Sequence, residues 1–171
     1  MQEKTGIVTF KGKPVTLLGP EIRVGDKAPD FRAVDSGLAP VTLSDFKGMI
    51  KIISSVPSLD TPVCDMETRR FNQEAAKLPE KVALITISLD LPFAQKRWCA
   101  AAGVDRVKVL SDYQDRSFAQ AYGVLVKELK LLSRSIFVVD ADNVVRYVQH
   151  VKEIAMEPDY ADVLGAVKRL S

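Results

Sequence analysis

The feature that most constrains the fold of this chain is the alternation of short, β-branched apolar runs with longer segments of helical pattern. One run, Met49–Ser55, is followed by a segment that starts at Pro62 and reads as a helix to Leu78. A second run, Val82–Leu89, is followed by a helix predicted over Pro92–Ala102. Proline at the first helical position, with proline or glycine just past the last one, marks both segments as helices. Strands that alternate with helices predict a sheet with helices on its faces.

The remaining pattern extends this alternation and frames it with hairpins. Further strands are expected at 31–34, 41–43, 107–110 and 135–139, and further helices at 115–122 and 159–170. A turn at 141–143 returns the chain antiparallel as 144–148. Residues 6–10 and 14–18 alternate in strand fashion around a short turn and predict an N-terminal hairpin. The order indicates an α/β, thioredoxin-like fold, in which a central mixed β-sheet is flanked by helices and an extra N-terminal β-hairpin is added.

Length and charge narrow the class of protein. The 171 residues have the usual size of one domain, so we expect a single domain over 1–171 with its hairpin at 1–18. A formal net charge of +2 is too balanced to predict a nucleic acid or a membrane surface as partner. No apolar run approaches the ~18 residues of a membrane span. No secretory signal is visible at the start, and we therefore expect a cytoplasmic protein.

Known cofactor and metal patterns are missing from the sequence. There is neither a Gly-x-Gly-x-x-Gly motif nor a P-loop, so no nucleotide site is predicted. Two cysteines 35 positions apart and one histidine lack the spacing of zinc ligands. We expect neither a cofactor nor a bound metal.

Cys64 carries the clearest chemical signal. Thr61 is placed to cap the helix that Pro62 begins, which puts Cys64 in its first turn. Unpaired N–H groups and the positive end of the helix dipole gather there and favour the thiolate, the nucleophilic form of cysteine. On position alone, a small buried hydrophobe at a helix start fits slightly better. The apolar face of this helix is predicted to comprise Val63, Met66, Phe71, Ala75 and Leu78.

An activated cysteine needs a base or a cation beside it. The single histidine, His150, ends a predicted hairpin strand, a place where a structural role is far commoner than a Cys–His dyad. The absence of Cys-x-x-Cys disfavours a dithiol active site. Arg134 is the better candidate, because it enters an apolar strand and a buried guanidinium needs a specific partner. An exposed arginine at a strand end fits the sequence equally well.

These residues resemble the peroxiredoxins, and more narrowly their thiol peroxidase branch of atypical two-cysteine type. The motif Pro-x-x-x-Thr-x-x-Cys is met in full by Pro57, Thr61 and Cys64. The resemblance covers nearly the whole chain, including the opening hairpin, Val-Gly-Asp-Lys-Ala-Pro-Asp-Phe at 24–31 and Ser-Arg-Ser-Ile-Phe-Val-Val-Asp at 133–140. The hairpin and the spacing to the second cysteine favour this branch over the others.

The resemblance implies a role for each candidate residue. Cys64 would attack the peroxide, and Cys99 in the second helix would then form an intrachain disulfide with it. Thr61 would hydrogen-bond the peroxide and the sulfur, and Pro57 would shield the thiolate from water. Arg134 would stabilise the thiolate and polarise the O–O bond. Without the resemblance, Cys99 fits a buried helix cysteine equally well.

The resemblance also implies partners and a conformational change. It predicts hydrogen peroxide and organic hydroperoxides as substrates, thioredoxin as reductant, and a homodimer. A disulfide needs Cα atoms within roughly 7 Å, so we expect the first turn of the Cys64 helix and the Cys99 helix to be locally unstable. Two alternatives stay open: a redox sensor that uses the same reactive cysteine, and a non-catalytic module whose cysteines are merely packed.

Overall fold

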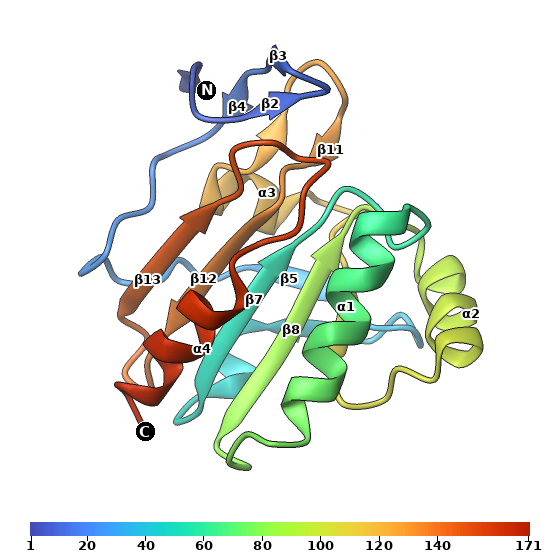
Figure 1. Cartoon of the computed structure of the whole chain (residues 1–171), viewed down its shortest axis with the longest axis vertical. Helices are drawn as coiled ribbons and strands as arrows, with labels where there is room; N and C mark the ends of the chain where they lie inside the picture. The colour runs from blue at the N-terminus through green and yellow to red at the C-terminus, as the bar shows by residue number, and fades with distance from the viewer.

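A seven-stranded sheet forms the centre of the molecule in the computed structural model, which describes residues 1–171 (Figure 1). In spatial order the strands are β13 (Val145–His150), β12 (Ser135–Val139), β7 (Ile50–Ser55), β8 (Val82–Ser88), β9 (Lys108–Ser111), β5 (Arg32–Val34) and β6 (Pro40–Thr42). The pairs β7–β8 and β8–β9 are parallel and the other pairs are antiparallel. The mixed sheet predicted from the sequence is confirmed.

Two apolar cores lie on opposite faces of this sheet, because successive strand residues point to opposite sides. One face carries α1 (Pro62–Ala75) and α4 (Tyr160–Lys168), which turn toward the viewer in Figure 1. The other face carries α3 (Ser117–Tyr122), whose aromatic rings pack edge-to-face against Phe31 and Phe137. α2 (Pro92–Ala102) lies beside α1 at the margin of the molecule. All six residues of the central strand β7 are buried.

The N-terminal hairpin is present but small. It comprises β2 (Thr9–Phe10) and β3 (Lys13–Pro14), which pair antiparallel around a turn. The flanking residues join a second sheet in the order β1 (Glu3–Lys4), β4 (Leu17–Leu18), β10 (Leu125–Val126) and β11 (Leu131–Leu132). The sequence did not predict β10 and β11, because two-residue strands are too short to show alternation.

Element bounds follow the helix signals closely. α2 has the predicted bounds, and Gly103 ends it in the left-handed conformation with φ 69°. α1 ends three residues before the predicted Leu78, and α3 begins at Ser117 rather than at 115. A single 3₁₀ turn, η1 (Leu43–Phe46), precedes β7. None of the helices combines the length and the apolar character that crossing a membrane requires.

The predicted inner face of α1 is wrong at one position. Met66 is 47% exposed, whereas the polar side chains of Glu67 and Thr68 are fully buried. The helix is rotated so that Cys64, Glu67, Thr68 and Phe71 face the core, a spacing of one helical face. The cause is a charged partner beneath α1 rather than apolar burial.

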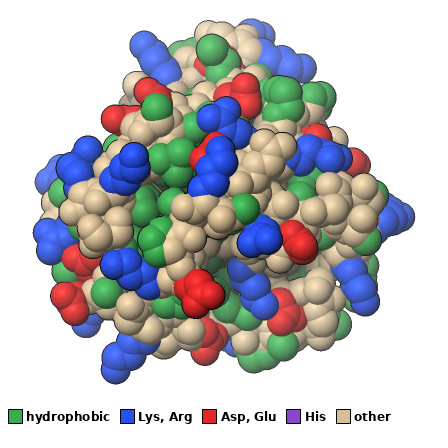
Figure 2. Space-filling view, turned by 60° about the horizontal axis from the view of Figure 1, so that its bottom comes forward, with side chains coloured by type: hydrophobic (Ala, Val, Ile, Leu, Met, Phe, Trp, Pro, Cys, Tyr) green, Lys and Arg blue, Asp and Glu red, His purple; other side chains and the backbone are tan.

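Elsewhere the surface is mixed in charge, and Figure 2 shows basic and acidic side chains interspersed on the face that it presents.

Candidate active site

Cys64 occupies the third position of α1 and is completely buried. Thr61 precedes the helix in an extended conformation and Pro62 is its first residue, so the proline removes no helical hydrogen bond. The expectation that the Thr61 side chain caps the helix is wrong. Its hydroxyl donates instead to the carbonyl of Ser58 at 2.9 Å, across the turn that leads into α1. This leaves the lone pairs of the Thr61 hydroxyl available beside the first turn.

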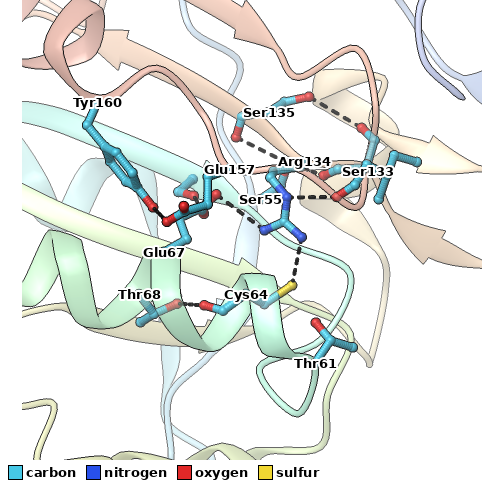
Figure 3. Close-up of polar contacts among 12 residues, drawn as sticks. Ser55, Thr61, Cys64, Glu67, Thr68, Ser133, Arg134, Ser135, Glu157 and Tyr160 are labelled. Carbon is cyan, nitrogen blue, oxygen red and sulfur yellow. Dashed lines mark hydrogen bonds and ion pairs between the residues drawn. The ribbon is translucent and has the colours of Figure 1, made fainter. Parts of the chain in front are cut away.

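Arg134 reaches from the start of β12 to the first turn of α1 (Figure 3). Its Nη2 donates to the Sγ of Cys64 at 3.2 Å, and its Nη1 donates to Oε1 of Glu67 at 3.3 Å. Its Nε donates to the carbonyl of Ile154 at 2.9 Å. The side chain is 2% exposed, so these three bonds fix a desolvated guanidinium against the sulfur. A cation in that position stabilises negative charge that develops on Sγ.

Glu67 is absent from the residues that the sequence predicts for this site. Its carboxylate is fully buried, pairs with Arg134 and accepts a 2.7 Å hydrogen bond from the hydroxyl of Ser54. Burial raises the pKa of Glu67, while Arg134 and the Ser54 hydroxyl oppose that rise. The available signal is spacing, because Glu67 lies three residues after Cys64 on the same helical face. Loss of either partner of such a buried pair costs about 3–5 kcal/mol.

His150, the last residue of β13, lies at the end of a chain of two hydroxyl groups, those of Ser135 in β12 and of Ser133 just before β12. Its Nδ1 is 2.8 Å from the hydroxyl of Ser135, and that hydroxyl is 3.3 Å from the hydroxyl of Ser133. Burial lowers the pKa of His150. The hydrogen bonds of Cys64 run to Arg134 through its sulfur and to Thr68 through its carbonyl, and His150 takes no part in them. The geometry therefore offers no Cys–His dyad.

The loop before α1 is held by a single carboxylate at the end of β8. Asp90 accepts from the Ser58 hydroxyl at 2.7 Å, the Leu59 N–H at 2.9 Å and the Ser88 hydroxyl at 2.7 Å. Pro57 is buried at the base of the same loop. A cavity of about 400 Å³ separates the loop from α2, with Leu59, Asp90, Gln95 and Trp98 among its lining residues. The loop is thus anchored on one side and open on the side of α2.

Cys99 is placed apart from the cluster around Arg134. Both cysteines are free thiols, and Cys99 is half-buried on α2. It lines a separate cavity of about 230 Å³ together with Asp35 and Lys108. Burial raises the pKa of the Cys99 thiol. The structure thus brings Thr61, Cys64 and Arg134 together, places Pro57 in the loop that leads into α1, and leaves Cys99 on α2.

This arrangement suits nucleophilic attack by Cys64 on a small electrophile. The sulfur is oriented by the helix and faced by a fixed guanidinium, and the Thr61 hydroxyl lies at the same turn. Donors that are fixed in advance stabilise charge that develops in a transition state more than charge in the ground state.

Comparison with known proteins agrees with this chemistry. Residues 23–164 match the Redoxin family. A thiol peroxidase of Halalkalibacterium halodurans is 55% identical over 161 residues, which are 94% of this chain and 96% of that protein. A thiol peroxidase of Oceanobacillus iheyensis is 56% identical over 162 residues, 95% of this chain and 98% of that protein. The crystal structure of a peroxiredoxin-like protein from Aquifex aeolicus superposes with a TM-score of 0.91 at 43% identity, covering 98% and 99% of the two chains.

Proposed function

The chain belongs to the Redoxin family and, within it, to the thiol peroxidases, and from that premise we propose that Cys64 is its peroxide-reactive thiol. It is an oxidoreductase that reduces peroxides with electrons from thiols. The redox-sensor alternative is not favoured, since relatives that span nearly the full length are peroxidases. The observation that carries the assignment is the 3.2 Å hydrogen bond from Arg134 Nη2 to Cys64 Sγ inside a sealed cluster.

The first step follows from this geometry. The Cys64 thiolate attacks one peroxide oxygen, the O–O bond breaks, and the second oxygen leaves as alkoxide or hydroxide and takes up a proton. Cys64 becomes a sulfenic acid. Arg134 stabilises the negative charge as it passes from the sulfur to the leaving oxygen. The Thr61 hydroxyl, whose proton is engaged by Ser58, accepts a hydrogen bond from the O–H of the peroxide and orients it.

Two further residues support this step. Pro57 is buried at the base of the loop and limits the access of water to the sulfur. Glu67 holds the guanidinium of Arg134 in line with Cys64, and the Ser54 hydroxyl holds Glu67 in turn. A side chain locked by such bonds keeps its geometry through the reaction.

The second step engages Cys99. Its thiol condenses with the Cys64 sulfenic acid, which forms the disulfide and releases water. A dithiol reductant then restores both thiols by exchange, and we assign this role to thioredoxin on the likeness to the family. The same likeness supports hydrogen peroxide and organic hydroperoxides as substrates, a homodimer and a cytoplasmic location.

Peroxide consumption coupled to thioredoxin, thioredoxin reductase and NADPH tests the proposal. Wild type is expected to turn over repeatedly, Cys64→Ser to show no peroxide-dependent NADPH loss, and Cys99→Ser to stop after one oxidation. Mass spectrometry of Cys99→Ser should then find oxygen added to Cys64. Full activity in Cys64→Ser would refute the assignment, and undiminished turnover in Cys99→Ser would refute the role of the second cysteine.

A further inference from the structure

The helix that carries Cys99 is weakly embedded in the fold. Of the eleven residues of α2, only Pro92 and Gln95 are buried. No side chain caps its N-terminus, and no charged residue complements its dipole in the first or last turn. Cavities of about 400 Å³ and 230 Å³ border it, and Gln95 lines both. Trp98, Cys99 and Ala102 pack half-buried against the core that contains Cys64 and Phe71, and Pro92 is the one fully buried apolar residue of α2. Because α2 is held by few fully buried contacts, it opens at lower cost than α1.

The one buried polar side chain of α2 is incompletely satisfied. The Nε2 of Gln95 donates to the Ser88 hydroxyl at 3.0 Å and to the Leu110 carbonyl at 2.8 Å. Its Oε1 is buried and has no hydrogen-bond partner. An acceptor that no protein donor satisfies contributes less to holding the helix closed than a paired one does.

A polar contact with α1 holds the other end of α2. The Nε1 of Trp98 donates to Oδ1 of Asp65 at 2.9 Å, and the Nε of Arg69 donates to Oδ2 of the same carboxylate at 2.9 Å. Arg69 also donates through Nη1 to the carbonyl of Ala102 at 3.2 Å and places its guanidinium 5.8 Å from the centre of the Trp98 ring. We call Asp65, Arg69 and Trp98 the latch.

The latch and the reactive pair are neighbours in sequence. Asp65 follows Cys64, and Trp98 precedes Cys99. Successive residues of a helix point about 100° apart. With Trp98 held toward α1, Cys99 is turned to the cavity that Asp35 and Lys108 line. Cys99 therefore cannot turn toward Cys64 while the indole of Trp98 is bonded to Asp65.

We propose that the latch sets the open fraction of α2, and thereby divides the Cys64 sulfenic acid between two fates. In the open state, Cys99 condenses with the sulfenic acid to give the disulfide and water. In the closed state, a second peroxide transfers an oxygen to the sulfenic acid, giving a sulfinic acid and water or alcohol. The inference rests on the proposed function, and it makes Trp98 and Asp65 positioning residues of the resolving step.

Trp98→Phe is the most selective variant, because it keeps an aromatic ring beside Arg69 while it removes the indole N–H together with the pyrrole part of the ring. Loss of one such hydrogen bond should enlarge the open fraction about fivefold. The rate constant of disulfide formation should rise by the same factor, and the sulfinic fraction at a given peroxide concentration should fall accordingly. The rate constant of sulfenic acid formation at Cys64 should stay at the wild-type value.

Rapid-quench mass spectrometry during a single turnover resolves the three oxidation states. The matched control is Phe93→Leu, which alters an aromatic ring on the same helix that is 64% exposed. Asp65→Ala should raise the resolving rate as Trp98→Phe does, and the double variant should add nothing further. A wild-type resolving rate in Trp98→Phe, an equal rise in the control, or additive effects in the double variant would each overturn the latch.

A second measurement separates the latch from the peroxidase chemistry. In a Cys64→Ser background, alkylation of Cys99 by iodoacetamide reports opening of α2 without any peroxide. Trp98→Phe should speed this alkylation about fivefold. If alkylation accelerates but no sulfenic acid forms in the protein that retains Cys64, the proposed function fails and the latch stands. If alkylation is unchanged, the latch fails regardless of the peroxidase result.

Discussion

The two helices that carry cysteines are held in opposite ways. α1 places Cys64 against Arg134 and Glu67, both almost fully buried and bonded to one another. α2 carries Cys99 on a helix that reaches α1 through side chains still open to solvent, with Arg69 47% and Asp65 33% exposed. A buried charge that loses its partner costs several kcal/mol, whereas an exposed pair contributes about 0–1 kcal/mol.

This difference matches two demands of the proposed cycle. Attack on peroxide needs a sulfur and a guanidinium in fixed relation, and the buried ion pair resists any displacement of α1 at that point. Condensation with Cys99 needs movement, and α2 has the weaker attachment. The expectation that the first turn of α1 and the Cys99 helix are both locally unstable stays a prediction; in the closed state Cys64 and Glu67 are buried in the core.

The largest expected effect is on α1, the helix whose cysteine is fixed by buried groups. Arg134→Lys keeps the buried charge, but a single ammonium cannot serve Cys64, Glu67 and the Ile154 carbonyl together. Loss of a fixed donor at a developing charge should lower the second-order rate constant of Cys64 oxidation about 10²–10³-fold. Stopped-flow measurement of sulfenic acid formation checks this.

The control for this variant is Arg70→Lys, which changes an exposed arginine of α1 paired with Glu74. It should oxidise at the wild-type rate. Equal rates in the two variants would show that the guanidinium at Cys64 is dispensable, and would remove the basis for calling α1 the fixed element.

The pH profile of disulfide formation tests whether α2 must open before Cys99 attacks. Thiolate is the attacking form, so below the pKa of Cys99 the rate constant should rise about tenfold per pH unit. Burial raises that pKa in the closed helix. If Cys99 attacks only after α2 opens, the profile should instead level off near the ordinary value of about 8.5. Fluorescence of Trp98, the single tryptophan, can follow the reaction. A rise that continues well past pH 9 would mean attack from the closed helix.

A substitution at the C-terminal end of α2 should have a smaller effect, and it tests how the attachment of α2 differs from that of α1. Gly103 ends the helix at φ 69°, and a Cβ there would meet no atom within 4 Å. Gly103→Ala therefore costs only backbone strain, about 1 kcal/mol, and should raise the resolving rate about fivefold. The matched control is Gly165→Ala within α4, where alanine fits without a positive φ. Gly165→Ala should stabilise α4 by about 0.5–1 kcal/mol and leave the resolving rate unchanged. If it instead lowers that rate about as much as Gly103→Ala raises it, global stability rather than the attachment of α2 controls the step.

Much of the fold is readable from local signals, and the site is readable only in part. Pro92 and Gly103 fix both ends of α2 because proline and glycine act on the backbone itself. Arg134 before an apolar strand predicts that some partner exists. It does not say which, because Glu67 approaches from 67 positions away in the chain. The same long-range pair turns α1 and exposes Met66, against the pattern of its apolar residues.

The smallest expected effect is that of replacing His150. This variant tests whether Arg134 and Glu67 are the only side chains that activate Cys64. A general base contributes about 10²-fold or more, so a hidden Cys–His dyad would be obvious in His150→Asn. His150 bonds to Ser135, and burial lowers its pKa, which favours the neutral ring. Asparagine can keep the bond to Ser135, and we expect the rate constant of Cys64 oxidation to change less than about twofold. A loss of tenfold or more would place a second activating group in the cluster, and Arg134 and Glu67 would no longer suffice to explain why α1 is held so tightly.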